Sequence, residues 1–197
     1  MNVGITPLEL AGLPGELRQQ LSPRVRRLGY LGDFFRYCGH QPEALLHFDK
    51  FTEALKQALP ADLTETVALT VAAAAGNDYE RAQHERLAAR LGFSGSWIAS
   101  LTGAEPQPPG LSAGQLAARA LALAMLGRDW ERAESSLARL AARIGQQQAV
   151  GVLMLAGRYL AHAAISNTLH LAVPSALQTG QAARAADGHA PPRPARA

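Results

Sequence analysis

Cysteine is almost absent from this chain of 197 residues. Cys38 is the only one, so no internal disulfide can form, and this favours a reducing, cytoplasmic location. The chain also lacks an uninterrupted apolar run of about eighteen residues, so no membrane span is expected. Its N-terminus lacks a basic stretch followed by an apolar one, so no secretory signal is expected either.

A large excess of positive charge is also missing. The formal net charge is +3. Residues 178–197 contribute +2 of this total, because they contain Arg184, Arg193 and Arg196 and a single acidic residue, Asp187. The remainder of the chain is therefore close to neutral. A nucleic-acid-binding face needs a basic patch or stripe, so we expect no nucleic-acid partner.

Helical periodicity runs through most of the chain, and no segment alternates with period two for long enough to predict a strand. The helices expected from apolar spacing and from Gly and Pro breaks are 14–37 (interrupted near Gly29 and Gly32), 43–58, 62–75, 78–91, 94–101, 112–126, 128–143 and 147–170. Asp62 is the expected N-cap of the third of these, and Ser112 with Gln115 predicts a capping box.

These patterns predict one all-α domain of about seven or eight helices over residues 1–175. Beyond it, residues 176–197 are rich in Ala, Pro and Arg. Such a composition cannot bury enough apolar surface to order itself, so we expect a disordered tail.

The most informative segment runs from Glu65 to His84. An Ala-rich helix with Glu65 near its start breaks at Gly76, and the next helix places Glu80 and His84 four residues apart on one face. A carboxylate beside an imidazole can transfer protons. A purely structural interpretation also fits, because Asn77 with Glu80, and Asp62 with Glu65, both have capping-box spacing.

This segment resembles the core motif of the alkylhydroperoxidase-D/carboxymuconolactone decarboxylase family. The peroxidase branch has a Glu, then eleven residues, Cys, two residues, Cys, three residues and His. Here Glu65 and His84 stand at the two ends, while Asn77 and Glu80 occupy the cysteine positions. A Glu at the second cysteine position, with the His kept, is the pattern of the decarboxylase branch.

Two further stretches carry the same resemblance. The stretch Asp78-Tyr79-Glu80-Arg-Ala-Gln-His84 is similar to a Glu-Tyr-Glu-x-x-x-His pattern found in many members. Gly157-Arg158-Tyr159, with Asn167 beyond it, resembles the Gly-His-Tyr…Asn of their last core helix, although Arg158 replaces the usual His. The resemblance covers roughly residues 5–173 and implies an AhpD-like helical fold.

The resemblance also implies a function. It suggests a cofactor-free acid–base lyase, working as a homo-oligomer on a small organic acid, lactone or carbonyl compound. His84 would donate a proton, Glu80 would orient it or hold its charge, and Glu65 would complete a relay. The substrate would be contacted by side chains from both stretches, namely Tyr79, Arg158, Tyr159 and Asn167. We expect no metal, because His84 and Glu80 are only two ligands.

Other functions remain open. Thiol peroxidase chemistry needs one thiol to attack the peroxide and another to resolve the sulfenic acid, which Asn77 and Glu80 cannot supply. It is therefore the weaker alternative, whereas a non-catalytic helical oligomer that binds a ligand or partner is the main one. For His84, an ionised Glu80 would raise the pKa and burial would lower it, so we expect titration near neutrality.

Overall fold

The computed structural model describes residues 4–174, and every regular element in this range is helical. The all-α prediction is confirmed, with nine α-helices rather than seven or eight. They follow a short 3₁₀ turn, Leu10–Gly12, and are α1 Gly15–Leu28, α2 Asp33–Cys38, α3 Pro42–Ala58, α4 Ala61–Ala74, α5 Asp78–Arg90, α6 Gly95–Thr102, α7 Ala113–Leu126, α8 Trp130–Ile144 and α9 Gln146–Thr168. The tail expected over residues 176–197 lies outside the described residues.

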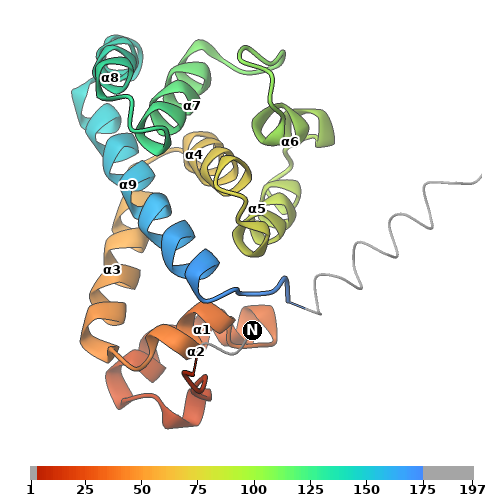
Figure 1. The fold of residues 1–197 in the computed structure, drawn as a ribbon, viewed down its shortest axis with the longest axis vertical. Helices are drawn as coiled ribbons and strands as arrows, with labels where there is room; N and C mark the ends of the chain where they lie inside the picture. The colour runs from red at the N-terminus through yellow and green to blue at the C-terminus, as the bar shows by residue number, and fades with distance from the viewer. Residues whose placement is uncertain (1–3, 175–197) are drawn as a thin grey trace, which may run out of the picture.

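Helix α4 is the centre of the fold. It packs against α5, α6, α7 and α9, which surround it in Figure 1. Its residues from Leu63 to Ala72 are all buried, so apolar side chains are not confined to one stripe, and the buried polar residues among them are Thr64, Glu65, Thr66 and Thr70. Small side chains such as Ala68 let the neighbouring helices approach closely.

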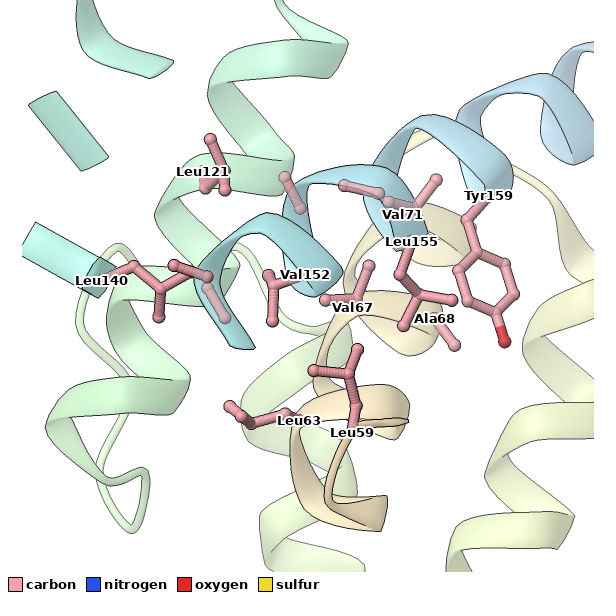
Figure 2. Packing of buried hydrophobic residues seen from close by; sticks show 14 of the residues in the cluster. Leu59, Leu63, Val67, Ala68, Val71, Leu121, Leu140, Val152, Leu155 and Tyr159 are labelled. Atoms are coloured by element: carbon pink, nitrogen blue, oxygen red, sulfur yellow. The ribbon is translucent and has the colours of Figure 1, made fainter. Parts of the chain in front are cut away.

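The main hydrophobic cluster lies where α4, α7, α8 and α9 meet. Val67 and Val71 of α4 face Val152 and Leu155 of α9, as Figure 2 shows. Tyr159 lies at the edge of this cluster, and its hydroxyl oxygen is directed away from the aliphatic side chains. Core packing therefore fixes the Tyr159 ring while leaving its polar end for other contacts.

The N-terminal helices α1, α2 and α3 form a second cluster. Leu17, Leu21, Phe34 and Leu46 pack together, and Tyr79 at the start of α5 joins them. This contact brings the N-terminal helices over the beginning of α5. It thus closes one side of the region that contains Glu80 and His84.

One predicted cap is wrong, and another is confirmed. Helix α4 begins after Pro60, so Asp62 lies inside its first turn, and the Asp62 carboxylate accepts a hydrogen bond from Gln115 Nε2 at 2.8 Å. The sequence pattern could not show this tertiary bond between α4 and α7. The capping box of Ser112 and Gln115 at the start of α7 is formed as predicted.

Helix α9 is long and apolar enough to cross a membrane when judged by length and composition alone. In the fold it packs against α3, α4, α7 and α8, and 44% of its most apolar window is buried inside the protein. The core helix of a globular domain has the same properties. The absence of a membrane span stays a prediction.

Candidate active site

His84 is the centre of a buried polar cluster. Its Nδ1 lies 2.8 Å from Glu65 Oε2, and its Nε2 lies 3.2 Å from the Tyr159 hydroxyl. Glu65 comes from α4, His84 from α5 and Tyr159 from α9, and each is at most 6% exposed. The two helices that carry Glu65 and His84 are joined by the turn at Gly76, whose φ of 61° suits glycine.

Glu80 is the second focus of the cluster. Its Oε2 lies 3.5 Å from His84 Nε2 and 3.7 Å from an Arg158 guanidinium nitrogen, while its Oε1 lies 3.5 Å from His162 Nε2. The carboxylate therefore faces two imidazoles and one guanidinium. The family motif predicted only His84 as a neighbour of Glu80.

Arg158 is held in place by α3. Its Nε donates to Thr52 Oγ1 at 2.8 Å, and Thr52 in turn donates to the Phe48 carbonyl at 2.7 Å. The guanidinium also lies over the Phe48 and Tyr159 rings, 5.0 and 4.5 Å from their centroids. These contacts aim the cation at Glu80, and the Arg158 side chain is only 9% exposed.

The side chain of His162 is fixed on three sides. Its ring stacks on Phe34 at a centroid distance of 3.9 Å, and its Nδ1 lies 3.1 Å from the Ser166 hydroxyl. Burial lowers the pKa of His162 to about 3, so this imidazole is neutral at physiological pH. Because the Glu80 carboxylate opposite Nε2 can only accept a hydrogen bond, it favours the tautomer with the ring proton on Nε2, which leaves Nδ1 to accept from Ser166.

Only one of the two hydrogen bonds of the predicted capping box between Asn77 and Glu80 is formed. The Asn77 side chain accepts a hydrogen bond from the Glu80 backbone N–H at 3.1 Å, as a helix N-cap does. The Asn77 backbone N–H, however, bonds the Ala72 carbonyl, and the Glu80 carboxylate points to the imidazoles instead. Glu65 likewise makes its side-chain contact with His84 rather than with the start of α4.

The cluster borders a cavity of about 390 Å³, within the range of small-molecule sites. Glu80, His84, Tyr79, Arg158 and His162 line its inner part. The remaining lining comes from α1 to α3 and from the outer face of α5, namely Arg24, Arg27, Leu28, Tyr30, Gly32, Phe34, Phe35, Thr52, Glu53, Lys56, Gln83, Arg86, Leu87 and Arg90.

Electrostatics make His84 a cation and Glu80 an anion. Burial alone would lower the pKa of His84, but Glu65 and Glu80 outweigh it and raise the pKa to about 9. Burial would raise the pKa of Glu80, but His162, which is protonated only at the low pH where Glu80 titrates, together with His84 and Arg158 holds it well below its usual range. The expectation that His84 titrates near neutrality is therefore wrong. It considered only Glu80, whereas Glu65 also lies against Nδ1 and raises the pKa further.

The other two residues expected to bind substrate lie in different surroundings. Tyr79 lines the cavity, where its hydroxyl accepts a hydrogen bond from the Phe34 backbone N–H at 3.3 Å and burial raises its pKa. Asn167 is exposed and is not among the lining residues; its amide donates to the Ala75 carbonyl at 2.8 Å. Asn167 therefore ties α9 to the end of α4 and is not brought to the site.

Sequence reasoning did not assign His162 or Thr52 to the site, since His162 lies outside the family pattern although its place on the last helix allowed it to face the pocket. His162 follows Arg158 by four residues and Tyr159 by three, so helical spacing alone places it near their face. Thr52 gave no such signal, because its contact with Arg158 joins α3 and α9. Within residues 4–174, no group of three or more His, Cys, Asp or Glu is arranged to hold a metal ion.

No family model matches the chain, and no curated protein matches it. Solved structures do. An uncharacterized peroxidase-related protein from Ralstonia eutropha JMP134, described as an alkylhydroperoxidase AhpD core, is 15% identical, with 87% of this chain and 92% of that chain covered and a TM-score of 0.68.

The debrominase Bmp8 is 17% identical in two structures. Its complex with 2,3,4-tribromopyrrole covers 93% of this chain and 98% of its own at a TM-score of 0.73, and its apo form covers 91% and 96% at 0.75. At these identities the likeness concerns the fold. The chain therefore has the AhpD-like helical fold.

Proposed function

We propose that this protein is a cofactor-free acid–base lyase of the decarboxylase type. Its substrate is a small organic acid whose lactone or carbonyl group lies next to the carbon that loses carbon dioxide. The observation that carries this proposal is the imidazolium of His84, held between Glu65 and Glu80 at the wall of a cavity. A buried, charged imidazole at a cavity wall is suited to deliver a proton.

The reaction needs no group that the chain lacks. The bond between the carboxylate carbon and its neighbour breaks, carbon dioxide departs, and the electron pair moves into the adjacent carbonyl as an enolate. His84 then gives its Nε2 proton to the carbon, and solvent returns a proton to the imidazole. Glu65 holds Nδ1 throughout, so the ring keeps its orientation.

Positive groups inside the cavity favour a carboxylate substrate. Lys56 lines the cavity, and its pKa is lowered, mainly by burial and secondly by the positive charge of the neighbouring Arg158. A substrate carboxylate placed near these two cations would stabilise both of them. The buried Tyr159 hydroxyl, whose pKa burial raises well above its usual value, stays protonated and serves as a neutral hydrogen-bonding group.

Thiol peroxidase activity is less well supported. Cys38 lines a different, apolar hollow of about 630 Å³ between α2, α3 and α9, and not the cavity beside His84. Burial raises the pKa of the Cys38 thiol to about 11, so very little of the reactive thiolate exists at neutral pH. A peroxidase would also need a second thiol, which the sequence does not contain.

The proposal is tested by measuring carbon dioxide release from a panel of β-keto and unsaturated lactone acids. In deuterated water, the product should carry deuterium at the carbon that lost the carboxylate. His84→Ala should lower kcat by about 10²-fold or more, the usual scale for a lost general acid. Glu80→Gln should also impair turnover, although it keeps the size of the side chain.

The matched controls are His47→Ala and Glu43→Gln, two substitutions at exposed positions outside the cavity. They should leave kcat unchanged. If no acid in the panel loses carbon dioxide while some of them bind, the non-catalytic ligand-binding alternative is favoured. If turnover is found but survives both His84→Ala and Glu80→Gln, the assignment of the proton donor is wrong.

A further inference from the structure

Positive charge is concentrated around the cavity. Six of the side chains that line it are Arg or Lys and two are Glu, which leaves four net positive charges. The whole chain has a formal net charge of only +3. With histidines counted as neutral, the cavity wall therefore carries more positive charge than the whole chain, and all other residues, including 178–197, sum to a net charge of −1.

Most of these cations have no carboxylate of their own. Arg24 pairs with Asp49 and Glu53, and Arg158 faces Glu80. By contrast, the described part of the chain places no carboxylate within ion-pair distance of the other four, which are Arg27, Lys56, Arg86 and Arg90. Both lining carboxylates are already engaged, so four cations remain for a ligand.

The four cations divide into an inner and an outer group. Lys56 belongs to the inner part, where it is close enough to Arg158 for this cation to lower its pKa. Arg86 and Arg90 lie one helical turn apart on α5, both are exposed, and both act electrostatically on Tyr30, which also lines the cavity. Arg27 of α1 completes the outer group.

We propose that these outer residues, Arg27, Arg86 and Arg90, form a subsite for a dianionic phosphoryl group on the substrate. One monovalent carboxylate is balanced by Lys56, and this leaves the three exposed guanidinium groups. Guanidinium forks bind phosphate oxygens in bidentate fashion, and a dianion can engage more than one of them. The subsite rests on the proposed function only in taking this cavity as the substrate site.

Inorganic phosphate and phenyl phosphate are the probes, and acetate and benzoate at the same ionic strength are the comparison. Binding is measured by calorimetry and by amide chemical shifts of α1 and α5 at low salt. Both phosphates should bind more tightly than both carboxylates. Their affinity should fall as salt is added, because the outer arginines are exposed to solvent.

The double variant Arg86→Gln with Arg90→Gln should weaken phosphate binding by roughly tenfold, since it removes two charge-assisted partners. The double variant Arg132→Gln with Arg143→Gln, at exposed positions on α8 outside the cavity, is the charge-matched control and should change nothing. His84→Ala should also retain phosphate binding. Phosphate binding by the wild type, combined with no turnover of any acid in the panel, would count against the lyase alone.

Three results would overturn the subsite. The first is that carboxylates bind as tightly as phosphates. The second is equal phosphate affinity of the double variant and the wild type. The third is a phosphate-induced shift of α8 amides instead of those of α1 and α5. Turnover of a substrate without a phosphoryl group, combined with any of these results, would leave the lyase proposal intact and reject the subsite.

Discussion

At the residue scale, His84 differs from an isolated histidine because two carboxylates surround it. Glu65 lies 2.8 Å from one ring nitrogen and Glu80 lies 3.5 Å from the other. Burial opposes the charged form, yet the pKa rises from 6.5 to about 9. The protein therefore stores a proton where a solvated histidine would have lost it.

This raised pKa predicts how stability depends on pH. A histidine whose pKa is higher in the folded state stabilises the fold fully below the unfolded value of 6.5, and this contribution disappears as pH rises through 9. Between these values the free energy of unfolding should fall by on the order of 3 kcal/mol. Urea unfolding from pH 6 to pH 10 measures this change, and nitrogen-15 NMR measures the pKa directly.

Glu65→Gln should flatten that alkaline decline, because the amide cannot stabilise the imidazolium as a carboxylate does. Glu43→Gln, at an exposed position, is the control and should reproduce the wild-type slope. The comparison uses the slope with pH and not the absolute stability, so a general loss of stability in Glu65→Gln does not obscure it. A His84 pKa near 6.5 in the wild type would contradict the assigned electrostatics.

At the element scale, the turn between α4 and α5 assembles the site. Asn77 caps α5 and thereby fixes where this helix begins. The start of the helix in turn sets the direction in which the Glu80 side chain points. Asn77 stands where the peroxidase branch of the resembled family has its first cysteine. The asparagine has a structural role at this position, because its side chain satisfies a backbone N–H that would otherwise be unpaired at the start of the helix.

Removal of this cap should destabilise the protein without removing any proposed catalytic group. Asn77→Ala should lower the free energy of unfolding by about 1 kcal/mol, the usual cost of a lost N-cap. Asn77→Asp, which retains a capping oxygen, should stay close to wild type. Thermal unfolding compares the three proteins, and equal stability of Asn77→Ala and the wild type would show that the cap contributes nothing.

At the scale of the whole molecule, apolar side chains remain on the outer face of α9. Val150 and Met154, one turn apart, are 50% and 45% exposed. Contiguous apolar surface of this kind favours association with another protein surface. The expectation of a homo-oligomer is consistent with such a face, and it stays a prediction.

We predict a mass above that of a monomer by light scattering at micromolar concentration. The double variant Val150→Glu with Met154→Glu should shift the mass toward the monomer, because burying unpaired carboxylates in an interface is unfavourable. Ala142→Glu, at an exposed position on α8, is the control and should keep the wild-type mass. A monomeric wild type would contradict this prediction.

The sequence by itself determined the helical class, most helix boundaries and the pairing of Glu80 with His84. These features depend on periodicity, on Gly and Pro breaks and on neighbours three or four residues apart, all of which are local. The Asp62 cap was wrong because α4 begins at Ala61, which places Asp62 inside the first turn, where its carboxylate bonds Gln115 of α7. Local patterns do not report such a tertiary contact.

The resemblance already implied Glu65 and Arg158 as site residues, but only the tertiary structure decided how the surroundings of that pair are arranged. Glu65, Thr52, Arg158 and His162 come from three other helices, and their contacts depend on how those helices pack. The same packing separates Asn167 from the cavity and gathers arginines from α1 and α5 at its mouth. The charge state of His84 follows from this assembly, because a pKa depends on burial and on charges within a few ångströms, wherever they lie in the sequence.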